Sequence, residues 1–171
     1  MENKINVAGL VNDSIVDGVG LRYVVFVQGC PRKCVGCHNA DTQPFVEKNL
    51  LTPEEIMTQI NSNPLLDGVT FSGGEPMCQA RALAPLARMI KEKNLHLAVY
   101  TGYTFETLLA SAMDGVRELL ECTDILIDGE FVQELRDYTL KFRGSSNQRV
   151  LDVKKSLQAG KAVLVNSEKW L

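Results

Sequence analysis

Three cysteines lie within eight positions of this chain, where Cys30, Cys34 and Cys37 form the pattern Cys-x-x-x-Cys-x-x-Cys. Thiolates are preferred ligands of iron–sulfur clusters and of zinc, so this spacing predicts a metal centre. The same spacing also fits one face of a helix, where free thiols often pack as small core residues. Two glycines and a proline interleave with the cysteines and oppose a helix, which favours the metal centre.

Two kinds of metal centre remain open from the residues alone. Structural zinc takes four ligands, commonly from two Cys-x-x-Cys pairs. The chain offers one triplet, with His38 next to the third cysteine and Cys78 as a remote candidate thiol. A 4Fe–4S cluster held by three cysteines leaves one iron free to bind a small molecule with an amine and a carboxylate. The triplet therefore predicts a catalytic cluster, and a non-catalytic zinc-binding module is the alternative.

Short β-branched runs alternate with amphipathic runs and provide the elements that must position these cysteines. Strands are predicted at 22–28, 68–71, 96–100, 124–127, 149–153 and 162–165. Helices are predicted after an N-cap at Thr52, over 79–93 and over 104–113. This alternation implies right-handed crossovers and parallel pairing. We therefore expect an α/β fold, a partial (open) β/α barrel of about six mostly parallel strands with helices outside.

Glycine-rich or ligand-bearing segments follow four of the predicted strands. They are 29–38, 72–76, 101–103 and 128–130. Ligands of such folds gather at the carboxyl ends of the strands, so four such segments on one rim predict a binding site. Taken singly, Gly73-Gly74 also fits a turn and Asp128 also fits a strand-end cap.

Composition limits the remaining function classes. The chain has 171 residues, of which 45% are hydrophobic and 23% charged, and its net charge is −3. These values predict a single globular domain over 1–171 and give no support for binding nucleic acid or a membrane through bulk charge. No signal peptide or membrane span is apparent, so we expect a cytoplasmic protein whose five cysteines stay reduced.

Taken together, these segments resemble the radical S-adenosylmethionine superfamily, and most closely the activating proteins of anaerobic, glycyl-radical ribonucleotide reductases. The resemblance runs from residue 17 to residue 148. It rests on Asp17-Gly18-Val19-Gly20-Leu21-Arg22, the cysteine triplet, Gly36-Cys37-His38-Asn39, Ser72-Gly73-Gly74-Glu75-Pro76, Tyr100-Thr101-Gly102-Tyr103, Asp128-Gly129-Glu130-Phe131 and Arg143-Gly144-Ser145-Ser146-Asn147-Gln148.

The resemblance implies one 4Fe–4S cluster, with Cys30, Cys34 and Cys37 as its ligands, and S-adenosylmethionine as the second cofactor. It also implies that reductive cleavage of S-adenosylmethionine gives a 5′-deoxyadenosyl radical, which removes a hydrogen atom from a glycine α-carbon. The implied partners are the large reductase subunit as protein substrate and an external electron donor such as flavodoxin or ferredoxin. A radical enzyme acting on a small metabolite, such as a deazapurine carboxylate synthase, is the alternative within the superfamily.

The resemblance also implies which residues bind S-adenosylmethionine. They are Gly36, Cys37, His38, Gly73, Gly74 and Glu75. Many superfamily members carry an aromatic residue at the position of Gly36, and relatives often have Tyr at the position of His38, so a ring at 38 is a candidate for stacking. Asp128 and Arg143 have no assigned role, and Cys78 and Cys122 are expected to be structural or incidental thiols.

Overall fold

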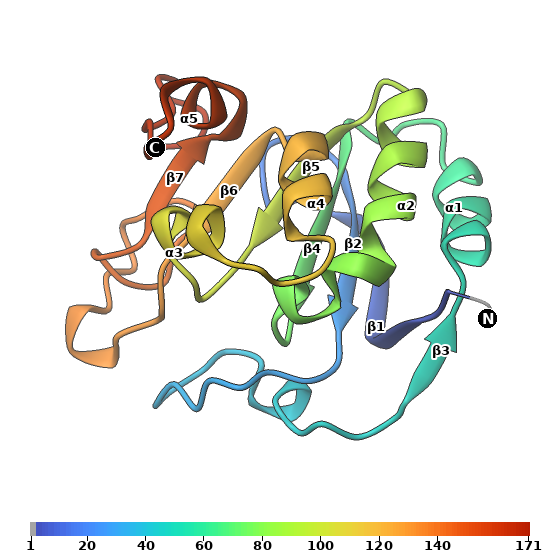
Figure 1. Ribbon diagram of the computed structural model, residues 1–171, viewed down its shortest axis with the longest axis horizontal. Coiled ribbons are helices and arrows are strands. Elements are labelled where there is room, and N and C mark those ends of the chain that lie inside the picture. Colours follow the sequence, from blue (N-terminus) through green and yellow to red (C-terminus); the bar gives the residue numbers. More distant parts are fainter. Residues whose placement is uncertain (1–2) are drawn as a thin grey trace.

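Seven strands form one open sheet in the computed structural model, which describes residues 3–171 (Figure 1). The strands are β1 (Ile5–Ser14), β2 (Arg22–Val27), β3 (Asn49–Leu51), β4 (Gly68–Gly73), β5 (His96–Tyr100), β6 (Ile125–Asp128) and β7 (Arg149–Asp152). Their order across the sheet is β3-β1-β2-β4-β5-β6-β7. The four central strands, β2, β4, β5 and β6, run parallel, and β1, β3 and β7 pair antiparallel at the two sides. The predicted α/β fold with an open arrangement of mostly parallel strands is confirmed.

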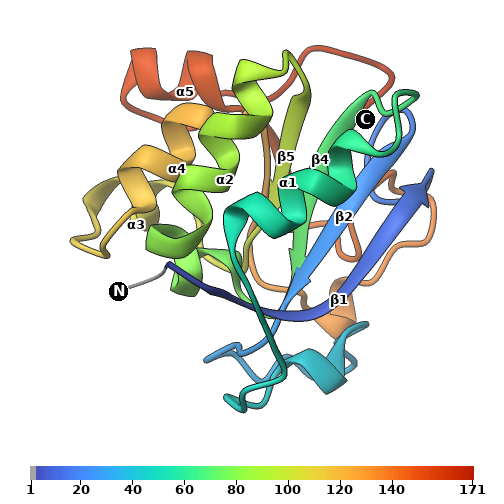
Figure 2. The same ribbon diagram turned by 90° about the vertical axis from the view of Figure 1, so that its right-hand side faces the viewer.

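All five α-helices cover one face of this sheet, as the two perpendicular views show (Figures 1 and 2). They are α1 (Pro53–Asn61), α2 (Ala80–Glu92), α3 (Phe105–Ala110), α4 (Val116–Cys122) and α5 (Val153–Ala159). Alternate side chains of the central strands, such as Tyr23, Val25 and Val27 of β2, are completely buried in the core beneath the helices. Because successive side chains of a strand point to opposite faces, the residues between them line the helix-free face.

The helix-free face has its own small core. Ala98, Ile127 and Val150 are buried there, and Trp170 near the end of the chain packs over them. Arg22 lies at the start of β2 and is also buried, with its guanidinium donating to Val69 O at 2.6 Å. This side of the sheet is therefore closed by loops and by the C-terminal segment instead of helices.

Several predicted elements are confirmed by the structure. Thr52 caps α1 with a complete capping box, in which its hydroxyl accepts from Glu55 N and the Glu55 carboxylate accepts from Thr52 N. The predicted strands at 68–71 and 96–100 correspond to β4 and β5. Among residues 3–171, no helix is long and apolar enough to cross a membrane.

Other expectations were wrong. The run 162–165 forms no strand, and only an isolated bridge joins Leu164 to Leu151. β7 pairs antiparallel with β6, since the chain returns through a long loop without a crossover helix. The predicted helix 104–113 ends at Ala110, and β1, β3, α4 and α5 were not predicted.

Candidate functional site

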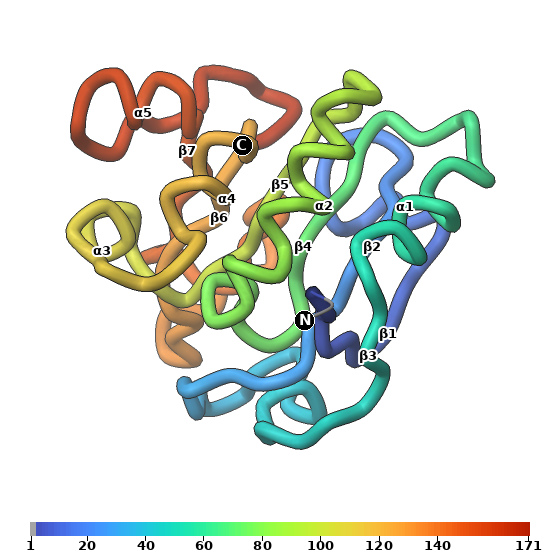
Figure 3. Tube along the Cα trace, turned by 45° about the vertical axis from the view of Figure 1, so that its right-hand side comes forward, coloured from blue at the N-terminus to red at the C-terminus, as the bar shows by residue number. Residues whose placement is uncertain are grey.

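The cysteine segment follows β2 at the carboxyl ends of the parallel strands (Figures 1 and 3). It is irregular backbone, held by Gly29 N donating to Thr42 O at 2.7 Å and Cys30 N donating to Gln43 O at 2.9 Å. All three thiols are free and partly exposed. The helical-stripe interpretation of the cysteines is therefore wrong, and the loop leaves their sulfur atoms available for ligation.

A cavity of about 460 Å³ lies beside this loop and gathers most of the predicted site residues. Its lining includes Cys30, Cys34, Cys37, His38, Gly73, Gly74 and Glu75. Gly36 lies outside the lining. Among residues 3–171, no three His, Cys, Asp or Glu side chains are close enough to hold a single metal ion. The three thiols share this cavity, and thiolates are the ligands of 4Fe–4S clusters.

The thiols differ in their surroundings. Burial raises the pKa of Cys30, and burial together with a hydrogen bond to Glu130 raises the pKa of Cys34 to about 11. The Cys34 Sγ lies 3.4 Å from Glu130 Oε1. Metal ligands must be thiolates, so metal binding at these residues releases protons.

The two glycines after β4 let its loop approach the loop after β2. Gly73 has a φ of +96°, and a Cβ added to Gly74 would lie 2.3 Å from Gly29 O. Gly74 N donates to Val27 O at 2.7 Å, and Glu75 N donates to Gly29 O at 2.9 Å. Side chains at these positions would separate the two loops, so both glycines fix the shape of the cavity wall that they line.

Glu75 is 1% exposed, and its carboxylate is bound by donors of the protein. Oε1 accepts from Thr101 Oγ1 at 2.8 Å and from Met77 N at 3.0 Å, and Oε2 accepts from Gly102 N at 2.8 Å. Burial raises the pKa of Glu75 despite these bonds, which act in the opposite direction. The carboxyl group therefore ties the loop after β4 to the loop after β5.

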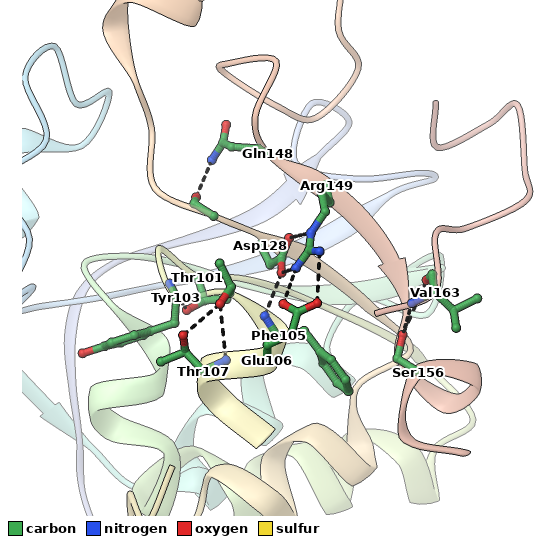
Figure 4. A network of polar contacts seen from close by, with 12 residues as sticks. Thr101, Tyr103, Phe105, Glu106, Thr107, Asp128, Gln148, Arg149, Ser156 and Val163 are labelled. Atoms are coloured by element: carbon green, nitrogen blue, oxygen red, sulfur yellow. Dashed lines mark hydrogen bonds and ion pairs between the residues drawn. The ribbon is translucent and has the colours of Figure 1, made fainter. Parts of the chain in front are cut away.

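Asp128 caps the end of β6 and binds protein donors (Figure 4). Its side chain accepts two bonds from Arg149, at 2.9 and 2.5 Å, and one from Phe105 N, at the start of α3, at 2.8 Å. Arg149 also donates to both carboxylate oxygens of Glu106, at 3.2 and 2.7 Å. Asp128 is absent from the cavity lining and joins β6, β7 and α3.

The segment between β6 and β7 closes one side of the cavity. The Gln148 side chain donates to Gly129 O at 3.0 Å and accepts from Gly144 N at 2.8 Å (Figure 4 shows the first bond). Asn147 Nδ2 donates to Glu130 O at 2.8 Å. These amides order the loop, and Arg143 of the same motif lines the cavity.

Phe131 and Arg136 contact the cysteine segment, and sequence reasoning gave neither a role. The Phe131 ring lies 5.2 Å from the His38 ring, centroid to centroid, with a 41° tilt. Arg136 lies over Phe131 at 5.3 Å and donates to Gly36 O at 3.3 Å. Gly36 has a φ of +72°, and an added Cβ would lie 3.0 Å from Gln133 Oε1 and 3.2 Å from Arg136 Nη2. A side chain at position 36 would therefore meet the ends of the Gln133 and Arg136 side chains.

The remaining cysteines lie away from the cavity lining. Cys78 is exposed, and a hydrogen bond joins its thiol to Tyr103. Cys122 ends α4 and packs against the core beneath the helices. The geometry gives no support for Cys78 as a fourth ligand, and Cys122 agrees with the predicted structural thiol.

Comparisons with known proteins agree with this site. The family model of a 4Fe-4S single cluster domain matches residues 16–151. The anaerobic ribonucleoside-triphosphate reductase-activating protein of Salmonella typhimurium is 35% identical over 147 residues, covering 80% of this chain and 91% of that protein. The protein of the same name from Escherichia coli K12 is 33% identical over the same shares.

Two other similar proteins match over smaller shares of the two chains. The pyruvate formate-lyase-activating enzyme of Clostridium pasteurianum is 37% identical over 119 residues, covering 66% of this chain and 47% of that enzyme. The crystal structure of QueE from Escherichia coli matches with a TM-score of 0.46 at 21% identity, over 61% of this chain and 54% of that one.

Proposed function

Since the chain belongs to the 4Fe-4S single cluster domain family and to the group of reductase-activating proteins, we propose that it activates an anaerobic ribonucleoside-triphosphate reductase. The activation consists of generating a glycyl radical on the reductase by reductive cleavage of S-adenosylmethionine. The observation that carries this proposal is the gathering of three cluster-type thiols and the Gly73-Gly74 loop on one cavity.

In this proposal Cys30, Cys34 and Cys37 hold the cluster and leave its fourth position open. When bound, a 4Fe–4S cluster supplies the single electron that cleavage of the sulfonium requires. The irregular loop lets the three sulfur atoms reach one cavity from one side. The Glu130 carboxylate accepts a hydrogen bond from the Cys34 thiol and another from Arg32 Nη1 at 3.0 Å. Arg32 therefore remains as a partner of Glu130 when Cys34 loses its proton and binds the cluster.

The cofactor-binding residues divide into two groups. Backbone carbonyls of Gly73 and Gly74 are the acceptors that we propose for the ammonium group of S-adenosylmethionine. The oxygens of Glu75 already bind protein donors, so this side chain holds the Gly73-Gly74 loop in place instead of binding the ammonium group directly. Its carboxyl group contributes charge close to that loop. His38, paired with Phe131, offers the ring surface for the adenine, and Gly36 makes room for the contact between Arg136 and the cysteine segment.

Two partners and a compartment complete the proposal. The large reductase subunit is the protein substrate, and a low-potential carrier such as flavodoxin or ferredoxin supplies the electron. Only one cluster-binding pattern is present in the sequence, which supports an external donor. Free thiols persist in a reducing compartment, so we place the protein in the cytoplasm.

The test is anaerobic reconstitution followed by electron paramagnetic resonance. We expect about four irons and four sulfides per chain, a cluster signal that S-adenosylmethionine perturbs, and a glycine-centred signal only when reductase, reductant and S-adenosylmethionine are all present. Changing Cys30, Cys34 or Cys37 to Ala removes the radical, whereas the matched control Cys122→Ala retains it.

Three results would contradict parts of this proposal. A single zinc ion in the oxygen-free protein, or radical formation in a cysteine variant of the triplet, would refute the cluster. A glycyl radical on pyruvate formate-lyase but not on the reductase would reassign the substrate, since one relative bears that name. Turnover of a small metabolite with neither protein substrate would favour the other branch of the superfamily.

A further inference from the structure

The last residues of the chain are tied to the loop that closes one side of the cavity. We call residues 166–171 the strap and residues 137–148 the Phe142 loop. The Trp170 ring of the strap lies 5.2 Å from the Phe142 ring, centroid to centroid, with a 59° tilt. Lys141 Nζ donates to Glu168 O at 2.7 Å. Two neighbouring residues of the Phe142 loop are therefore joined to the strap.

The strap is itself anchored to the sheet through Trp170, whose side chain is buried. Its ring stacks on His96, the first residue of β5, with centroids 5.5 Å apart and 23° between the planes. The guanidinium carbon of Arg22, the first residue of β2, lies 5.8 Å from the centre of the same ring. Arg22 is held in turn, because its Nε donates to Thr70 Oγ1 at 2.7 Å. Trp170 thus gives Phe142 a fixed partner.

Phe142 has a strained backbone, with a φ of +56°. Among residues 3–171, the other non-glycine residue with a positive φ is Asn94, a type that tolerates this conformation. The left-handed conformation disfavours a residue with a Cβ by a factor of about 5 to 30. Such a residue keeps it only where the surrounding contacts hold it there. The Phe142 ring packs against the small core of the helix-free face, and Trp170 is its aromatic neighbour in that core.

The conformation of Phe142 sets the path of the residues that follow it. Phe142, Arg143 and Gly144 all line the cavity. A Cβ added to Gly144 would lie 2.8 Å from Phe131 Cδ2 and 3.3 Å from His38 Cε1, so the backbone of Gly144 packs against both rings. These two rings are the surface that we assign to the adenine. A series of direct contacts therefore connects the strap with the proposed adenine site.

We propose that Trp170 is a positioning residue for S-adenosylmethionine, an inference that rests on the proposed function for the identity of the ligand. By holding Phe142 in the left-handed conformation, Trp170 keeps Gly144 at the proposed adenine site. The apparent Kd of a ligand rises in proportion as the binding-competent conformation becomes less populated. Loss of the Trp170 ring therefore weakens the binding of S-adenosylmethionine by about 5- to 30-fold.

The first test uses amide hydrogen exchange in the metal-free chain. Asp137 N donates to Gly144 O at 3.2 Å and so reports whether the Phe142 loop is closed. We expect Trp170→Ala to speed exchange at Asp137, and Trp170→Phe, which keeps a ring, to restore slow exchange. Leu119→Ala is the control, since Leu119 is completely buried in the core beneath the helices and is absent from the cavity lining. It destabilises the fold and leaves the local opening at Asp137 unchanged.

The second test measures the Kd of S-adenosylmethionine by equilibrium dialysis on reconstituted holoproteins. Phe142→Ala and Phe142→Gly both lack the ring, and only the alanine variant has a Cβ that opposes a positive φ. We expect Phe142→Ala to bind about 5- to 30-fold more weakly than Phe142→Gly. Trp170→Ala raises Kd by the same factor in the wild-type background, and by no more than about 2-fold when combined with Phe142→Gly.

The outcomes separate the strap from the proposed function. Equal Kd values for Phe142→Ala and Phe142→Gly, or the same loss from Trp170→Ala in both backgrounds, would overturn the inference. Phe142 is partly exposed, so its two variants keep the test decisive even if Trp170→Ala does not fold. If wild type binds no S-adenosylmethionine while Trp170→Ala still speeds exchange at Asp137, the proposed function fails and the contact between strap and loop stands.

Discussion

Arg149→Met removes the cation that joins β6, β7 and α3 while keeping an apolar side chain of similar length. Asp128 is then left with a completely buried carboxylate and Phe105 N as its remaining donor. Breaking a buried ion pair from one side costs about 3–5 kcal/mol. The Arg149 side chain is itself 33% exposed and its second partner, Glu106, is 54% exposed, so we take the lower end, about 3 kcal/mol.

The assay is thermal and urea unfolding of the metal-free chain. For a chain of this size, about 3 kcal/mol corresponds to a fall in Tm of about 6–12 °C. Adding Asp128→Asn removes the unpaired charge, so we expect the double variant to lose less than the sum of the two single variants. Arg117→Met is the control, since its pair with Glu121 is exposed on both sides and contributes about 0.3–0.5 kcal/mol. The reasoning is refuted if Arg149→Met costs no more than Arg117→Met.

Three further variants test other parts of the fold and the site. Thr52→Ala removes the cap of α1 and should cost about 0.5–2 kcal/mol in urea unfolding; an unchanged midpoint would contradict the capping box. Gly74→Ala places a Cβ against Gly29 O, so we expect the free energy of unfolding to fall by about 1–3 kcal/mol and the cluster content after reconstitution to fall as well. A full cluster content would show that the two loops can separate without cost. Burial and then Arg22 lower the pKa of His96 to about 4. The unfolded chain therefore binds the proton first, and the free energy of unfolding falls as the pH drops from about 6.5 towards 4. His96→Gln should flatten this pH dependence, and equal profiles of wild type and variant would refute the role of His96.

Signals contained in a few neighbouring residues were sufficient to predict parts of this structure. The cap at Thr52 and the non-helical cysteine loop follow from spacing and from residues that oppose a helix. The run 162–165 is apolar enough for a strand, yet its backbone finds only one bridge, because strand formation depends on a partner elsewhere in the chain. Phe131 and Arg136 reach the cysteine segment from about 100 positions away in the sequence, a contact that only the folded chain brings about.

Glu75 has a mechanical consequence for the rim of the sheet. One carboxyl group holds the turn after β4 through Met77 N and the turn after β5 through Thr101 and Gly102. These bonds couple the positions of the two turns. We therefore expect a molecule that immobilises Gly74 to slow amide hydrogen exchange at Gly102 as well, because Gly102 N donates to the Glu75 carboxylate.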